Sequence, residues 1–317
     1  MPVERKVSTA TDDGTASFRA GTLTSPTHAV VGSHDVEATV KFFTCLGFEP
    51  ATRRPIPSEA ASALYGLESA TEEVELTAGG SLRGAICIVG TPRRATPCGP
   101  FDVGGYDLSL YTTDLDRSAE VAARAGAHVG PVAVLKLGPV VMRQQQAIGP
   151  EGIRIVFIQS SHRRPSILDD DPKRVHSEVH SIVWCVESIE RAAPFWRRAG
   201  LAQAFDAPIA DPAVSTLLEL SRPLVPIRMS LFSDDSLSPS RFELLEFPED
   251  GLSRPREGVP PPGIWALGFG VPDVASAISA LQGGSFGEAV FLEPARRAAT
   301  GEAPGGVRFE LREAAGR

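Results

Sequence analysis

The sequence of 317 residues predicts an α+β protein built from four copies of one strand–helix–strands module, paired into two similar halves. Three observations predict this architecture. A short apolar strand, a polar residue and an amphipathic helix occur together four times. Each helix is followed by two or three apolar runs with β-branched residues. A charged stretch containing proline, residues 161–177, separates the second copy from the third and is predicted to be a linker.

Each copy starts with a strand that leads into a helix. The four copies are AVVGSHDVEATVKFFTCLGF, LSLYTTDLDRSAEVAARAGA, SIVWCVESIERAAPFWRRAGL and ALGFGVPDVASAISALQGG. The polar residue after each strand can accept hydrogen bonds from the free N–H groups of the first helical turn, which predicts helix N-caps at Asp35, Asp114, Ser188 and Asp273. These positions lie too far apart for a solenoid, whose repeats have roughly 20–50 residues. Each copy therefore predicts a compact βαβββ module.

The apolar runs after the helices complete the modules. They are GAICIVG in the first module, GPVVMRQQQAIG and GIRIVFIQ in the second, PIRMSLF and RFELLEF in the third, and AVFLEP and GVRFELRE in the fourth. We predict a polar N-terminal tail at residues 1–24, one two-module domain at 25–160 and another at 178–317.

Composition and charge exclude several classes of partner. With 31 basic and 39 acidic residues the formal net charge is −8, and no basic stretch with interleaved aromatic residues could follow a phosphate backbone. Nucleic acid and anionic membranes are therefore not expected as partners. The first 24 residues lack the apolar segment of a signal peptide and no run of 18 apolar residues occurs, so we expect a cytoplasmic protein. The chain also lacks a phosphate-binding loop and a dinucleotide fingerprint, so no nucleotide cofactor is expected.

The module starts LGFEP (46–50) and AGLAQ (199–203), and the module end EAPGGVRFELRE (302–313), resemble the vicinal oxygen chelate superfamily of glyoxalases, bleomycin-resistance proteins and extradiol dioxygenases. The resemblance covers nearly the whole chain. It implies that pairs of modules curve their sheets round a bowl, often with a divalent metal at its centre. It also implies that the metal ligands come from the first and last strands of the modules. Because such pairs form between chains as well as within one, a homodimer is possible.

On this resemblance, the carboxyl-terminal half carries the candidate metal site. The first strand of the third module offers His180, its last strand offers Glu243, and the last strand of the fourth module offers Glu310. Trp265 takes the equivalent first-strand place in the fourth module. One nitrogen and two oxygen ligands suit Mn²⁺, Fe²⁺, Co²⁺, Ni²⁺ or Zn²⁺.

Strand alternation indicates which side chains face the bowl. In residues 307–313 the apolar residues alternate with polar ones, which directs Arg308, Glu310 and Arg312 towards the cavity. In RFELLEF we prefer Glu243 over Glu246 as the inward residue, because the opposite choice would bury Glu243 unpaired beneath a helix.

Other interpretations of these residues remain open. His180 can be a hydrogen-bonded histidine of the bowl, with the acids paired to the arginines. Arg308 and Arg312 can hold a substrate carboxylate or simply neutralise Glu310. In the amino-terminal half Val156 stands where Glu310 stands in the fourth module, so no metal is expected there and His28 is interpreted as structural.

The ligand set favours a redox-neutral reaction. A bound metal would polarise the carbonyl of a substrate with vicinal oxygens, and Glu243 or Glu310 would serve as the base of an isomerase, epimerase or lyase. The alternative is a metal-free bowl in which Trp184, at the same inward parity as His180, and Trp265 stack on a bulky aromatic or polyketide-like ligand, to sequester or cyclise it. A ring-cleaving dioxygenase is less favoured, because its iron needs two histidines and none follows His180.

Overall fold

The computed structural model describes residues 23–92, 99–234, 237–248, 262–293 and 296–314. Residues 1–22 of the predicted tail lie outside this part of the chain. The described residues form four modules of strands and short helices, which confirms the α+β class. No helix among them is long and apolar enough to cross a membrane.

The first two modules have the expected order of elements. The first contains β1 (His28–Ser33), α1 (Val36–Cys45), β2 (Phe48–Ile56), α2 (Ser58–Tyr65), β3 (Thr71–Ala78) and β4 (Ala85–Gly90). The second contains β5 (Gly104–Thr112), α3 (Leu115–Arg124), β6 (His128–Leu137), β7 (Val140–Ile148), the short 3₁₀ turn η1 (Pro150–Gly152) and β8 (Arg154–Ser160).

The last two modules follow a similar order, with one additional strand after the helix of the fourth. The third contains β9 (His176–Cys185), α4 (Ile189–Arg198), β10 (Ala202–Ile209), α5 (Pro212–Leu217), β11 (Ile227–Ser233) and β12 (Arg241–Glu246). The fourth contains β13 (Gly263–Val271), α6 (Val274–Ala280), β14 (Ser285–Phe286), β15 (Val290–Glu293), β16 (Arg296–Ala303) and β17 (Val307–Glu313).

The four predicted helix N-caps are confirmed. The side chains of Asp35, Asp114, Ser188 and Asp273 each accept a hydrogen bond from the backbone N–H three residues further on. Each cap satisfies a donor that the first turn would otherwise leave unpaired. The cap residues therefore fix where α1, α3, α4 and α6 begin, directly after the first strand of each module.

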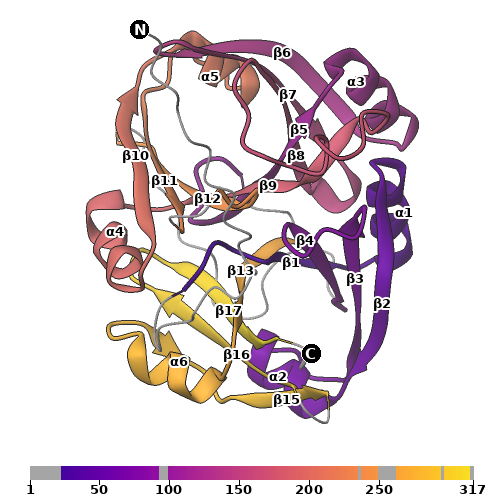
Figure 1. The fold of residues 1–317 in the computed structure, drawn as a ribbon, viewed down its shortest axis with the longest axis vertical. Helices are drawn as coiled ribbons and strands as arrows, with labels where there is room; N and C mark the ends of the chain where they lie inside the picture. Colours follow the sequence, from indigo (N-terminus) through magenta and orange to yellow (C-terminus); the bar gives the residue numbers. More distant parts are fainter. Residues whose placement is uncertain (1–22, 93–98, 235–236, 249–261, 294–295, 315–317) are drawn as a thin grey trace, which may run out of the picture.

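The modules pair into two curved sheets, but not within the halves of the chain (Figure 1). One sheet has the order β14-β16-β17-β13-β1-β4-β3-β2, with β15 on β16, and joins the first module to the fourth. We call it the outer bowl. The other has the order β10-β11-β12-β9-β5-β8-β7-β6 and joins the second module to the third. We call it the middle bowl.

This pairing corrects the expected division into two-module domains at 25–160 and 178–317. In each bowl the first strands of two modules lie side by side and antiparallel, β1 on β13 and β5 on β9. All four modules start with the same strand and helix pattern, so nothing in that pattern distinguishes one partner module from another. Both bowls therefore combine residues from the two halves of the sequence.

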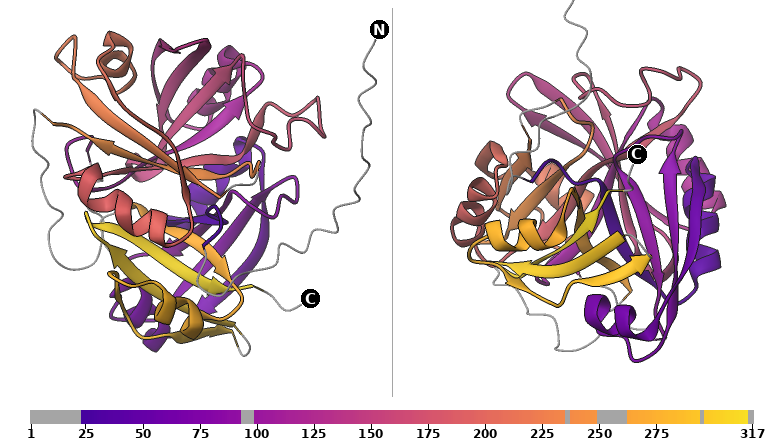
Figure 2. Two further views of the ribbon diagram at one scale, coloured as in Figure 1. Left: turned by 60° about the vertical axis from the view of Figure 1, so that its left-hand side comes forward. Right: turned by 60° about the horizontal axis from the view of Figure 1, so that its bottom comes forward.

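A shared core holds the two sheets together. Residues of their convex faces and of the helices α1, α3, α4 and α6 form one large hydrophobic cluster. Figure 2 shows the arrangement of these sheets and helices from two further sides. The concave faces have apolar clusters of their own. Helix α2 of the first module packs into the outer bowl and helix α5 of the third module packs into the middle bowl. Each concave face is therefore covered by one short helix.

Candidate functional site

The floor of the middle bowl carries two carboxyl groups on either side of a valine. Asp107 on β5 pairs with Val183 on β9, and Val183 pairs with Glu243 on β12. Val183 belongs to the concave apolar cluster, whereas Leu108 and Leu244 belong to the core beneath the sheet. Asp107 and Glu243 therefore face the bowl from backbones that are two strand spacings, about 10 Å, apart.

The two carboxyl groups differ in their surroundings. Burial, strengthened by the nearby Glu243 carboxylate, raises the pKa of Asp107 to about 8. The Ser109 hydroxyl donates to Asp107 Oδ1 at 3.1 Å. Glu243 instead accepts a hydrogen bond from Arg241 Nη2 at 3.1 Å. A protonated carboxyl group thus stands near a carboxylate that is paired with an arginine, which is the arrangement that acid–base chemistry requires.

Polar atoms without protein partners surround this pair. Ser181 lies between Ser109 and Arg241 in the next row of the sheet. Within the described residues, Ser181 Oγ and Arg241 Nε are buried without a hydrogen-bond partner. Leaving such groups unpaired costs about 1–3 kcal/mol each, so atoms of this kind favour a bound molecule or water as the missing partner.

His180 adds a third unpaired atom. Its Nδ1 lies 3.1 Å from the Pro239 carbonyl oxygen, and its ring stacks on Tyr111 with 3.8 Å between ring centroids. Burial and the nearby Arg241 lower the pKa of His180 well below its ordinary range, so the ring is neutral. A neutral ring that donates from Nδ1 has its lone pair at Nε2, and this buried atom lacks a partner among the described residues.

Helix α5 covers the middle bowl. Val214 of the helix and Leu218 at its end belong to the concave apolar cluster. Gln146 Nε2 donates to the Leu217 carbonyl oxygen at 2.8 Å, and His128 Nε2 lies 3.0 Å from Glu219 Oε1. These few contacts hold the cover to β6 and β7.

The outer bowl contains the equivalent row, but there the two side chains touch. His28 on β1 pairs with Gly268 on β13, and Gly268 pairs with Glu310 on β17. His28 Nε2 lies 3.0 Å from Glu310 Oε1. A Cβ atom on Gly268 would come within 2.2 Å of His28 Nε2, so the glycine makes this contact possible. Val183 at the equivalent place keeps the two acids of the middle bowl apart.

Two buried arginines neutralise the acids of the outer bowl. Arg312 Nε donates to Glu310 Oε1 at 2.7 Å, while its Nη1 and Nη2 donate to Glu73 at 3.0 and 2.8 Å. Arg54 also donates to Glu73, from Nε at 2.9 Å and from Nη2. Tyr65 of α2 donates to Glu310 Oε2 at 2.7 Å. Among the described residues, none of the buried polar atoms in this network lacks a partner.

The pKa values of the two glutamates follow from this network. Burial alone would raise the pKa of Glu310, but Arg312, His28 and Tyr65 outweigh it and bring that pKa to about 2. Burial also opposes ionisation of Glu73, and the two arginines again outweigh it and lower the pKa. The outer bowl is therefore a charge-balanced interior.

The structure contains a possible metal-binding triad in the outer bowl. Glu73, Glu75 and Cys87 each offer a ligand atom, and these atoms lie within 4.8 Å of one another. As arranged, they do not fit a divalent ion. Both carboxylate oxygens of Glu73 accept hydrogen bonds from Arg312, and burial raises the pKa of the Cys87 thiol well above its ordinary range. In the described part of the middle bowl, no three histidine, cysteine or acidic side chains gather as closely.

The contact between His28 and Glu310 can be tested at the glycine between them. Gly268→Ala should lower the free energy of unfolding by about 3 kcal/mol, because the new methyl group pushes His28 off the buried carboxylate. Urea denaturation measures this change. Gly270→Ala on the same strand is the matched control, since its Cβ would meet only the side chain of Thr27 among the described residues, with Cγ2 at 3.3 Å and Oγ1 at 3.9 Å. Equal losses for the two variants would contradict the assigned role of Gly268.

The predicted site residues are divided between the two bowls. The expected set of His180, Glu243 and Glu310 does not come together, because Glu310 lies in the outer bowl and the other two lie in the middle bowl. Glu243 faces its bowl as expected, whereas Glu246 Oε2 accepts from the Ile189 N–H at the start of α4, at 2.7 Å.

The predicted aromatic and basic residues are divided in the same way. Trp265, Arg308 and Arg312 lie with Glu310 in the outer bowl, where the ring centroids of Trp265 and Tyr65 are 5.7 Å apart. Trp184 does not face a bowl. A bulge in β9 at His180 reverses the alternation, so Trp184 packs in the shared core and its Nε1 donates to the Gly306 carbonyl oxygen.

Sequence reasoning missed several residues of both interiors. Asp107 could have been found, because an acidic residue inside the first strand of a module, in GGYDLSL, is unusual in an apolar strand and indicates a buried functional group. Glu73 and Glu75 alternate with apolar residues in TEEVELTA. Nothing in the sequence showed that α2 would bring Tyr65 to Glu310.

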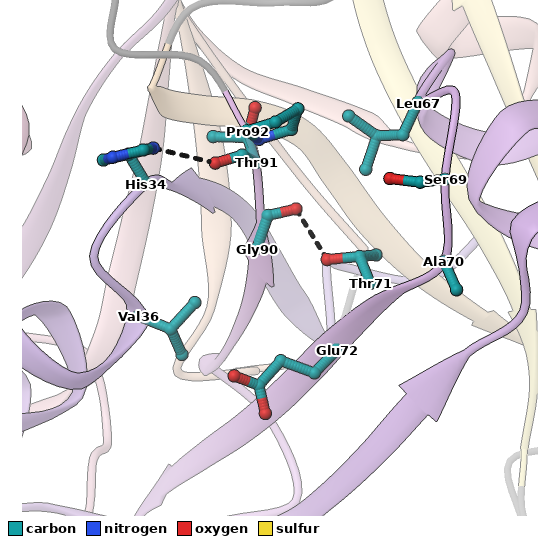
Figure 3. A pocket seen from close by; sticks show the side chains of 10 residues that line it. All are labelled: His34, Val36, Leu67, Ser69, Ala70, Thr71, Glu72, Gly90, Thr91 and Pro92. Atoms are coloured by element: carbon teal, nitrogen blue, oxygen red, sulfur yellow. Dashed lines mark hydrogen bonds between the residues drawn. The ribbon is translucent and has the colours of Figure 1, made fainter.

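A surface hollow of about 450 Å³ lies outside both bowls, beside the ends of β1 and β4 (Figure 3). Its polar groups largely satisfy one another. His34 Nδ1 lies 3.2 Å from the Thr91 carbonyl oxygen, and Thr71 Oγ1 donates to the Gly90 carbonyl oxygen at 2.7 Å. This hollow carries no cluster of groups comparable to that of the middle bowl.

Two curved sheets built from four βαβββ modules define the vicinal oxygen chelate fold, and the chain has this fold. It is similar to glyoxalase I from Zea mays, with a TM-score of 0.61 and 16% identity over 91% of this chain and 92% of that one. It is also similar to a "putative dioxygenase" from Bacillus subtilis, with a TM-score of 0.64 and 10% identity over 92% of this chain and 86% of that one. No protein-family model matches the sequence, and a sequence search of curated proteins finds no match.

Proposed function

We propose that the protein is an enzyme of the isomerase, epimerase or lyase type that moves a proton on a small carbonyl compound bound in the middle bowl. Asp107 acts as the general acid and Glu243 as the general base. The observation that carries this proposal is the pair itself: two carboxyl groups in one bowl, of which one holds its proton up to a pKa of about 8.

The geometry of the row supports these roles. A substrate resting on Val183 would lie between the two carboxyl groups, which approach from β5 and β12. Glu243 would remove a proton from the carbon next to the carbonyl group, and Asp107 would donate one to the oxygen or to the opposite face. Such proton transfers typically contribute 10²–10⁴-fold to a rate.

The unpaired atoms of the same floor would orient the substrate. Arg241 Nε can donate to a substrate oxygen, while His180 Nε2 can accept from a hydroxyl group. Two neighbouring oxygens on the substrate would satisfy both atoms. No step of this reaction passes through a metal, because the triad of the outer bowl is blocked by arginine and lies in the other sheet.

Hydrogen exchange with solvent tests the proposal. The wild type should incorporate deuterium from D₂O next to the carbonyl group in one or more members of a panel of hydroxyketones, 2-oxo acids and related compounds, with a chelator present. NMR follows the loss of the C–H signal. Asp107→Asn and Glu243→Gln should each slow this exchange by about 100-fold or more.

The matched control is Glu246→Gln, which makes the same change on the same strand but outside the bowl. Its amide oxygen can still accept from the Ile189 N–H, so exchange should continue at the wild-type rate. Exchange that survives in Asp107→Asn, or that occurs only when the chelator is left out, would sink the proposal.

A second candidate is a binding protein for an apolar ligand, favoured by the apolar residues that flank the same floor. Met229, Leu231 and Leu245 belong to its concave cluster. A ligand that binds tightly to the wild type and equally to Asp107→Asn, with no exchange or turnover, would support this candidate over the enzyme.

A further inference from the structure

The guanidinium group of Arg312 lies among potential metal ligands at the centre of the outer bowl. It bonds both oxygens of Glu73 and lies 3.5 Å from Cys87 Sγ through Nη1. Glu73 and Cys87 are two members of the triad whose ligand atoms lie within 4.8 Å of one another. Arg312 is only 4% exposed, so its guanidinium group fills this position and keeps solvent out of it.

The third member of the triad, Glu75, is held more loosely. It pairs with Cys87 in the sheet, and its carboxylate lies 3.5 Å from Arg54 Nη2. Zinc binds cysteine sulfur and glutamate oxygen, and its open sites combine three protein ligands with a water molecule as the fourth. The three side chains could thus form a zinc site, but the positive charge beside them is the guanidinium group of Arg312.

We propose that Arg312 is a built-in cation that blocks a zinc site formed by Glu73, Glu75 and Cys87, and that removing its side chain allows this site to bind one zinc ion. The proposal is independent of the reaction assigned to the middle bowl. It concerns residues on β3 and β4, together with one arginine of β17 that reaches them across the bowl.

The net charge of the groups in this interior is the same with Arg312 as with a zinc ion in its place. In the wild type Glu73, Glu75 and Glu310 carry three negative charges against the two positive charges of Arg54 and Arg312, with the Cys87 thiol neutral. When alanine replaces Arg312, one Zn²⁺ brings two positive charges and the thiol releases one proton to solvent as the zinc–sulfur bond forms. The net charge is then unchanged.

Zinc titration of the whole protein tests the proposal. Arg312→Ala should bind about one zinc ion per chain, and its thermal midpoint should rise with zinc concentration and fall again with chelator. At a zinc concentration about 100 times the dissociation constant, the ratio of folded to unfolded protein should rise about 100-fold. Binding should release a proton, which the dependence of the calorimetric heat on the buffer reports. The wild type should show none of these effects.

Two further variants isolate the cause. Arg312→Lys keeps the positive charge and should bind no zinc, like the wild type. Arg312→Ala combined with Cys87→Ser should lose the thiolate-to-metal absorption that Co²⁺ produces in Arg312→Ala alone. This pair of results also excludes zinc held by cysteines or histidines elsewhere in the chain.

Each outcome decides the proposal. If Arg312→Ala folds only when zinc is supplied, the zinc site is supported. If it fails to fold at every zinc concentration, or folds without binding zinc, the proposal is overturned. Zinc binding by the wild type or by Arg312→Lys with the affinity of the alanine variant would also overturn it, since the arginine would then block nothing.

Discussion

Asp107→Asn should become steadily more stable relative to the wild type as the pH rises from about 4 to about 8. In the folded protein the buried carboxyl group keeps its proton up to a pKa of about 8, whereas in the unfolded chain it titrates near 3.8. At Asp107 the folded state therefore binds more protons in this window, so this carboxyl group makes the free energy of unfolding fall as the pH rises. The contribution of Asp107 to this fall is on the order of 5 kcal/mol. Asparagine has nearly the same shape and does not titrate.

Urea denaturation below, within and above this window measures the effect. The variant should gain stability relative to the wild type as the pH rises, while any proton-transfer activity falls by about 10²–10⁴-fold. Glu243→Gln is the informative companion, because removing that carboxylate should lower the pKa of Asp107 and move the window to lower pH. Parallel stability curves for the wild type and Asp107→Asn would show that Asp107 does not hold a proton in the folded state.

Local structure could be predicted from the sequence because local chemistry determines it. Asp35, Asp114, Ser188 and Asp273 begin their helices where the unpaired N–H groups of a first turn need an acceptor. The alternation of residues 307–313 correctly directed Glu310 into a bowl, since the apolar side chains Phe309 and Leu311 pack in the core beneath.

The pairing of modules could not be predicted in the same way. It depends on which first strands meet edge to edge, and the repeated pattern is equally compatible with several partners. The consequence for the site is large. His28 and Glu310 come from opposite ends of the chain and lie 3.0 Å apart, whereas His180 and Glu310, which belong to the same half, lie in different sheets.

Single residues account for the remaining differences. The bulge at His180 turns Trp184 out of the middle bowl, and no rule of alternation anticipates a bulge. In the outer bowl Gly268 allows the side chains on either side of it to touch, whereas in the middle bowl Val183 keeps the two acidic side chains apart. The two bowls thus share a plan but differ in chemistry, with a neutralised interior in one and a separated acid pair in the other.

Glu310→Gln should be the most destabilising conservative change in the outer bowl, lowering the free energy of unfolding at neutral pH by about 3–5 kcal/mol. The amide removes the charge that faces Arg312 and leaves one oxygen in place of the two that serve His28, Tyr65 and Arg312, while Arg312 stays buried. Losing one carboxylate partner of a buried arginine is penalised far more than losing a surface ion pair. Thermal or urea unfolding at neutral pH measures the loss.

The dependence of the free energy of unfolding on pH under acidic conditions, the acid limb of the stability curve, gives a second and independent test. The pKa of Glu310 is depressed to about 2 in the folded protein, so its contribution is complete above its ordinary pKa of 4.5 and is lost as the pH falls towards 2. Glu310→Gln should flatten this limb, while Glu288→Gln, at an exposed position, should leave it unchanged. If Glu310→Gln matched the wild type in both respects, the arginines of the outer bowl would have to be balanced by Glu73 alone, and the charge balance described for this interior would be wrong.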